Sequence, residues 1–90
     1  MNEAVSSWFV YAQYDLRTIP LVMADDLFGV ACFHAQQCVE KSLKAALILS
    51  EKKVILTHYR HPERDDSERA FETAKMVFDR AMKLAQEADK

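Results

Sequence analysis

The sequence has few of the residues that interrupt helices or cross-link a fold. Its 90 residues include one glycine, two prolines and two cysteines. So few turn-forming residues argue against a domain of many short strands. Cys32 and Cys38 would lie about 120° apart around a helix and cannot bridge each other, so we interpret them as small buried residues in a reducing cytoplasm. The small numbers of glycine, proline and cysteine residues therefore predict one all-helical domain without a disulfide.

Long apolar runs and a net basic charge are also missing. No stretch approaches the roughly 20 apolar residues that a membrane span needs, and no basic region followed by an apolar run indicates a signal peptide. We therefore expect a cytoplasmic protein with no membrane partner. The net charge is −2, but residues 41–64 carry six basic and two acidic side chains. This local excess is either a basic patch or a solvated helix end followed by a loop.

Two segments at the ends of the chain each carry one apolar stripe. The first covers about residues 2–19, and we expect Pro20 to stop or break it. The other follows Pro62, with Asp66 or Ser67 as its cap, and runs to about residue 88. The first stripe consists of Val5, Trp8, Phe9, Ala12, Leu16 and Ile19. The other consists of Phe71, Ala74, Phe78, Ala81, Ala85 and Ala88, widened by Ala70, Val77 and Leu84.

The segment between them begins near Asp25 or Asp26, runs to about Ser50 and has two apolar stripes. One consists of Leu27, Ala31, Cys38, Ala45 and Leu49, and the other of Phe28, Cys32, Ala35, Val39, Leu43 and Ala46. His34 interrupts the first stripe, so we interpret it as a core histidine with a backbone or glutamine partner. The polar face consists of Gln36, Gln37, Glu40, Lys41 and Lys44. Two apolar faces predict the central helix of a bundle or an additional interface.

Residues 31–45 read Ala-Cys-Phe-His-Ala-Gln-Gln-Cys-Val-Glu-Lys-Ser-Leu-Lys-Ala. This run resembles the second helix of HEPN domains, the nucleotide-binding domains of higher eukaryotes and prokaryotes. Weaker similarities to the family cover residues 8–16, 56–58 and 59–62. The resemblance implies one stand-alone HEPN-like domain over residues 1–90, with an all-α, up-and-down antiparallel helical bundle. The resemblance also implies that four polar residues of the central segment belong to an interface or to the core. These residues are Gln37, Glu40, Lys41 and Lys44.

The chain departs from the family pattern where His58 meets Tyr59. Family members usually carry roughly 30 or more residues, including another helix, between the elements that these two residues resemble. Either this chain is a shortened variant with three long helices, or an intervening stretch is missing and the bundle has four or five. The mass of the intact protein separates the two, because the shortened variant weighs 10.4 kDa.

Ribonucleases of the HEPN family are recognised by an arginine followed four to six residues later by a histidine. The arginine would hold the scissile phosphate, and the histidine would move the proton of the ribose hydroxyl. Here His61 follows Arg60 directly, so the spacing of the family's ribonucleases is absent. Arg60 and His61 are therefore only weak catalytic candidates, and the sequence favours a protein that is not an enzyme. His58, Arg60, His61 and Arg64 remain candidates for binding a nucleotide phosphate or RNA. The alternative interpretation of these four residues is a solvated loop.

The expected function is therefore a non-catalytic module that binds a nucleotide or a partner as a homodimer. The resemblance suggests a minimal nucleotidyltransferase as that partner, in a toxin–antitoxin-like system. The alternatives are a metal-independent HEPN ribonuclease toxin and a purely structural helical adaptor. We expect no cofactor and no metal, since His58, His61 and nearby Glu63 lack further ligands.

Overall fold

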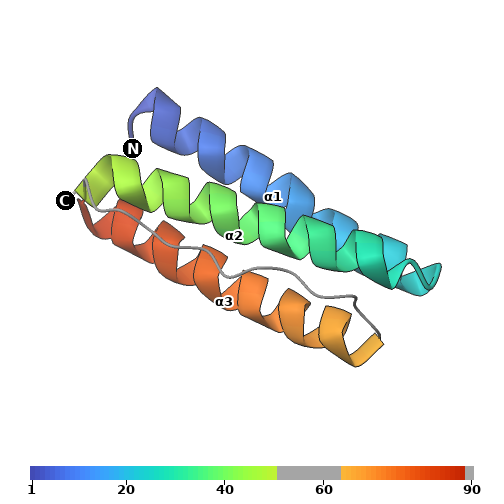
Figure 1. The fold of residues 1–90 in the computed structure, drawn as a ribbon. Helices are drawn as coiled ribbons and strands as arrows, with labels where there is room; N and C mark the ends of the chain where they lie inside the picture. The colour runs from blue at the N-terminus through green and yellow to red at the C-terminus, as the bar shows by residue number, and fades with distance from the viewer. Residues whose placement is uncertain (51–63, 89–90) are drawn as a thin grey trace.

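Three long helices make up the described part of the chain. The computed structural model describes residues 1–50 and 64–88, and it contains α1 (Glu3–Ala24), α2 (Phe28–Ser50) and α3 (Arg64–Ala88) (Figure 1). Within those residues no strand forms, which confirms the all-α helical bundle. No described helix is long and apolar enough to cross a membrane.

α2 is the middle helix of the bundle, as its two apolar stripes predict. It packs closely against both α1 and α3, whereas α1 and α3 contact each other much less (Figure 1). Ala31, Cys38 and Ala45 along its length are fully buried. A helix with neighbours on both sides needs apolar residues over more than half of its surface, and small residues let both neighbours approach closely.

The helix directions match the expected up-and-down arrangement only in part. α1 and α2 are antiparallel, but α3 runs parallel to α2 (Figure 1). Two contacts fix this direction, because the Arg64 guanidinium at the start of α3 lies over the Phe28 ring at the start of α2, and the Cys38 thiol lies 4.0 Å from the Ala74 carbonyl oxygen further along. An up-and-down bundle from which one helix has been removed leaves a parallel pair of this kind.

α1 extends one turn beyond the expected end at residue 19. The Asn2 side chain accepts a hydrogen bond from the Val5 N–H and caps the first turn. Pro20 lies inside the helix, which continues to Ala24, so the expectation that Pro20 stops the helix is wrong. Proline removes one backbone hydrogen bond, but Val22 and Met23 beyond it pack against the core. This tertiary packing compensates for the lost bond.

Asp25 and Asp26 end α1 instead of capping the start of α2. The Leu27 N–H donates to the Val22 carbonyl and the Asp26 N–H to the Met23 carbonyl, a pattern that closes a helix when the residue after its cap is left-handed. Asp26 has φ 58° and occupies that position. The sequence places an aspartate where glycine is the usual solution, and the turn between α1 and α2 is correspondingly strained.

We expect Asp26→Gly to raise the free energy of unfolding by about 0.5–1 kcal/mol, because glycine adopts positive φ without penalty. The substitution also removes an ion pair with Arg64, but both side chains are more than half exposed and the pair is worth little. Urea denaturation followed by circular dichroism measures the change. Asp25→Gly is the control and should not stabilise, because Asp25 has φ −99°. Equal effects of the two substitutions would contradict the role of the backbone angle.

The core follows the contacts of α2 with α1 and with α3. It also includes one aromatic ring from each of α1 and α3. The rings of Phe9 and Phe78 meet edge to face, with centroids 5.8 Å apart, a favoured aromatic geometry. The buried apolar side chains that form this core are Val5, Phe9, Ala12, Ile19, Ala31, Ala35, Cys38, Ala45, Ala74, Phe78, Ala81 and Ala85. Most of the predicted stripe residues are thus confirmed.

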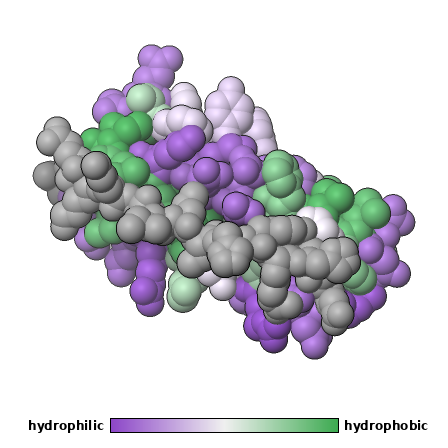
Figure 2. All heavy atoms as spheres, viewed as in Figure 1, coloured by the Kyte–Doolittle hydropathy of each residue, from purple (hydrophilic) through white to green (hydrophobic). Residues whose placement is uncertain are grey.

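The predictions for two core residues and for the start of α3 are wrong. Leu84 is 59% exposed, because the contact of α3 with α2 uses the narrower stripe of Ala81 and Ala85. Leu27 is exposed in the turn between α1 and α2. α3 begins at Arg64, so Ser67 lies in its first turns, where its hydroxyl donates to the Arg64 carbonyl. Figure 2 shows hydrophilic residues over the middle of one face and hydrophobic residues towards its two ends.

Candidate functional site

A buried carboxylate of α1 binds two cationic or proton-carrying side chains of α2. Asp15 is only 7% exposed. Its Oδ1 lies 2.8 Å from His34 Nδ1, and its Oδ2 accepts a hydrogen bond of 2.5 Å from Lys41 Nζ. The His34 and Lys41 side chains remain 26% and 25% exposed. We call these three residues the Asp15 cluster.

Helical spacing brings the Asp15 cluster together. His34 and Lys41 are seven residues apart, which is close to two turns, so both lie on the side of α2 that faces α1. Asp15 lies three residues after Ala12 and four before Ile19, in the stripe of α1 that packs against α2. A lone carboxylate in this stripe would be costly, and two donors satisfy its two oxygens.

The Asp15 cluster has the arrangement that orients a histidine for proton transfer. An ionised carboxylate only accepts hydrogen bonds, so His34 Nδ1 donates to Asp15. In the neutral imidazole this leaves Nε2 as the acceptor, the tautomer that a general base requires. About a quarter of the His34 side chain is exposed to solvent, at 26%. Lys41, by contrast, forms an ion pair with Asp15.

Aromatic and amide side chains surround the Asp15 cluster on the surface. The Phe33 ring is exposed and meets the His34 ring edge to face, with centroids 5.5 Å apart. Tyr11, one helical turn before Asp15, is exposed as well. Lys44 is exposed, and its ammonium lies 4.8 Å from the centroid of the Trp8 ring. We call Tyr11, Phe33, His34, Gln37, Lys41 and Lys44 the α1–α2 face.

The residues that the sequence predicts for phosphate binding are only partly described. His58, Arg60 and His61 lie outside the described residues. Arg64 is described, and its guanidinium pairs with Asp26 at 2.8 Å and lies 4.6 Å from the centroid of the Phe28 ring. Arg64 therefore sits at the first turn of α2, roughly 20 Å along the helix from Lys41. The structure does not bring Arg64 together with the lysines of α2.

The four signature residues of α2 have different environments. Lys41 is not a solvated lysine but the partner of buried Asp15. The Gln37 side-chain amide donates to Glu40, and Lys44 covers Trp8. The described contacts include no ion pair between Glu40 and Lys44, which a surface spacing of four residues would allow. Lys41 thus belongs to the core of the α1–α2 contact, while Gln37 and Lys44 remain on the surface.

Sequence reasoning did not find the role of Asp15. The prediction of His34 as a core histidine with a backbone or glutamine partner is wrong, because its side chain is 26% exposed and its partner is Asp15. The available signal was an aspartate inside the apolar stripe of residues 5–19. Matching it with a histidine and a lysine seven residues apart on the next helix would have predicted the Asp15 cluster.

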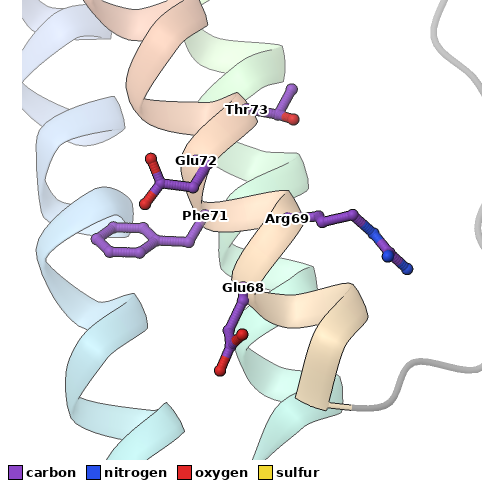
Figure 3. A pocket seen from close by; sticks show the side chains of 5 residues that line it. All are labelled: Glu68, Arg69, Phe71, Glu72 and Thr73. Carbon is purple, nitrogen blue, oxygen red and sulfur yellow. The ribbon is translucent and has the colours of Figure 1, made fainter.

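A separate open pocket lies on α3. It is lined by Glu68, Arg69, Phe71, Glu72 and Thr73. Figure 3 shows that Arg69 and Thr73 point away from the bundle, while Phe71 points towards α1. Arg69 pairs with Asp66, and the Lys75 ammonium lies over the Phe71 ring. All five residues come from one helix, so the pocket is a surface depression without convergent groups. The described residues also include no group of histidine, cysteine or acidic side chains that could hold a metal.

Cys38 packs against α3, and the ionisation of its thiol depends on how deeply it is buried. Burial raises the pKa of its thiol from 9.0 to about 11, while the Ser42 hydroxyl and the Lys41 charge oppose the rise. The unfolded chain therefore ionises this thiol first as the pH rises. The stability that the neutral buried thiol contributes is present below pH 9 and is lost between about pH 9 and 11.

We expect the wild-type protein to lose about 1 kcal/mol more stability than Cys38→Ala between pH 8 and 10, because one pKa unit corresponds to about 1.4 kcal/mol. Urea denaturation of both proteins at the two pH values measures this difference, and the titration of lysines and tyrosines cancels. Cys32→Ala serves as a second comparison. The same pH dependence in wild type and Cys38→Ala would contradict the prediction.

Comparison with known proteins identifies the family. The family model described as HEPN domain matches residues 5–59, which is more than half of the chain. The chain belongs to the HEPN family. No curated protein and no solved structure matches it significantly. The HEPN match contains all of α2 and nearly all of α1, and with them the whole Asp15 cluster, but it ends before α3 begins.

Proposed function

We propose that this HEPN protein is a non-catalytic module that binds a nucleotide on the α1–α2 face and acts as a homodimer. The observation that carries the proposal is the combination on this face of two exposed rings, an accessible imidazole and an exposed lysine. Rings of Tyr11 and Phe33 offer stacking surfaces for a base. His34 Nε2 and the Gln37 amide offer hydrogen bonds beside them.

Lys44 is the cation best placed for the phosphates. Its ammonium is exposed, whereas Lys41 is held by Asp15. The distance along α2 from His34 to Lys44 is about 15 Å, so one extended nucleotide could contact both. A phosphate that binds Lys44 would form charge-assisted bonds, which are about twice as strong as neutral ones. The nearby negative charges, Asp15 and Glu40, already accept hydrogen bonds from protein donors.

The placement of the cations argues against catalysis. His34 has no arginine four to six residues before it, and Arg64 lies at the other end of α2. Lys41 is the cation next to His34, and Asp15 neutralises it. A scissile phosphate at His34 would therefore lack an unpaired cation among the described residues that flank it.

ATP without metal tests nucleotide binding by thermal shift and calorimetry. At 100 times its dissociation constant, ATP should add about 2.7 kcal/mol to the free energy of unfolding. Lys44→Ala should weaken binding roughly tenfold through the loss of one charge-assisted contact. The matched control, Lys83→Ala, removes an exposed lysine of α3 and should bind like wild type. The absence of any shift with wild type would overturn the proposal and favour a purely structural adaptor.

A second candidate function, a metal-independent ribonuclease, is favoured by the Asp15–His34 pair alone. Incubation with total RNA compares the wild type with His34→Ala and Arg60→Ala. Cleavage that is lost in His34→Ala but kept in the folded Lys83→Ala control would support this candidate. RNA that stays intact with the wild type eliminates it.

The HEPN family also suggests a minimal nucleotidyltransferase as the partner, in a toxin–antitoxin-like module. An adjacent nucleotidyltransferase reading frame and a complex formed on co-expression would support this partner. If the two proteins elute separately after co-expression, this part of the proposal fails, and nucleotide binding remains to be judged by its own test.

A further inference from the structure

A carboxylate lies on α2 between the ring and the lysine that we propose for binding a nucleotide. Phe33, Gln37, Glu40 and Lys44 follow one another at spacings of four, three and four residues. All four therefore lie within about 60° of one another around the helix. Phe33 and Lys44 are exposed, while Gln37 and Glu40 are half-buried. The negative charge of Glu40 thus stands in the middle of a row that would bind an anionic ligand.

Glu40 is oriented by the protein but is not neutralised by it. The Gln37 side-chain amide donates to Glu40 Oε2 over 3.2 Å. Lys44, four residues further on, is the usual ion-pair partner on a helix, but its ammonium lies over the Trp8 ring instead. In the part of the chain that the structure describes, Glu40 forms no ion pair and accepts no other hydrogen bond. A carboxylate has about four acceptor positions, so Glu40 can accept further hydrogen bonds from a ligand.

The order of the groups along α2 is the order of the parts of a ribonucleotide. The Phe33 ring can stack on a base, and the Lys44 ammonium can bind phosphate. Glu40 lies about 10 Å along the axis from Phe33 and about 6 Å from Lys44, where the sugar would lie. The 2′- and 3′-hydroxyls of ribose are hydrogen-bond donors, and they are the donors that a carboxylate at this place would accept.

We propose that Glu40 binds the ribose hydroxyls of the ligand and makes the α1–α2 face specific for ribonucleotides. The inference rests on the proposed function and adds the recognition of the sugar to it. Hydrogen bonds from hydroxyls to a carboxylate are charge-assisted and are about twice as strong as neutral ones. A sugar without hydroxyls leaves Glu40 without donors and close to the phosphates, where it repels them. Gln37 acts as a positioning residue, because its amide holds one oxygen of Glu40.

Calorimetry with ATP and with 2′,3′-dideoxy-ATP tests the recognition of the sugar. The second ligand keeps the base and the phosphates but lacks both hydroxyls. The titrations contain no metal, so that no cation can bridge Glu40 and the phosphates. The wild type should bind ATP at least about tenfold more tightly, because a hydrogen bond to a charged group is lost with the other ligand. Equal binding of the two ligands would overturn the inference and leave nucleotide binding intact. If neither ligand binds, the proposed function itself fails.

Glu40→Ala should change the two affinities in opposite directions. ATP should bind about fivefold more weakly, because its hydroxyls lose their acceptor. Dideoxy-ATP should bind roughly twofold more tightly, because the repulsion of its phosphates is removed. A loss of affinity for both ligands would make Glu40 a structural residue, and a gain for both would make it a source of repulsion only; either result overturns the inference. Glu68→Ala, at an exposed glutamate of α3, is the control and should keep the preference of the wild type for ATP.

Discussion

Phe9→Ala is expected to lower the free energy of unfolding by about 3–4 kcal/mol, because it truncates one of the largest side chains in the core. Phe9 is 3% exposed and contacts Phe78 across the contact of α1 with α3. Truncation removes the buried ring and leaves a cavity that the surrounding structure closes only in part. A domain of 90 residues has a total stability of roughly 5–13 kcal/mol. The variant should therefore melt more than about 10 °C below the wild type.

Urea and thermal denaturation followed by circular dichroism measure this loss. Phe33→Ala is the matched control, because it deletes the same ring at a position that is more than half exposed. We expect the control to cost less than about 1 kcal/mol, mostly through its contact with His34. A double-mutant cycle of Phe9 and Phe78 should give a coupling of about 0.5–1.5 kcal/mol. Similar losses for Phe9→Ala and Phe33→Ala would contradict the proposed packing of the core.

Asp15→Asn is expected to lower the free energy of unfolding by about 2–3 kcal/mol. The substitution keeps the shape but places an amide NH₂ against one of two donors, Lys41 or His34. Removing one partner of a fully buried ion pair costs roughly 3–5 kcal/mol. The smaller figure applies here because about a quarter of each donor side chain is exposed and water screens the remaining charge.

Asp79→Asn is the control for Asp15→Asn, since Asp79 is an exposed aspartate in the middle of α3. It should change the stability by less than about 0.5 kcal/mol. Double-mutant cycles of Asp15 with Lys41 and of Asp15 with His34 then divide the loss between the two contacts. If Asp15→Asn is as stable as the control, the Asp15 cluster does not hold α1 against α2. A folded Asp15→Asn that binds ATP like the wild type would show that the cluster is structural only.

Local patterns predicted the helices well because their causes are local. The apolar spacing of residues 5–19 and 70–85 fixed which faces are buried, and the two stripes of α2 indicated its central position. The errors occur where long-range contacts compensate for a local cost. Pro20 is tolerated because Val22 and Met23 beyond it still pack. Asp26 adopts a left-handed conformation because the short turn requires one.

The candidate site differs from the one that the sequence suggests, for the same reason. The HEPN resemblance makes Gln37, Lys41 and Lys44 part of an interface or core signature, and the periodicity of α2 makes His34 a core histidine. The sequence could not show that Asp15 joins two of them, because 19 and 26 residues separate Asp15 from His34 and Lys41. Such pairings depend on how two helices are aligned along each other. The residue pattern of one helix alone does not predict that alignment.

The helical fold, the central position of α2 and the resemblance to HEPN domains are predictable from residue patterns. These properties follow from spacing within one helix and from one contiguous motif. The folded bundle is needed to show that α3 runs parallel to α2, that Asp15 neutralises Lys41 and orients His34, and that Val10, Tyr14, Arg17 and Leu21 face solvent. Each of these depends on which helix covers which face, and that is settled by packing between segments far apart in the chain.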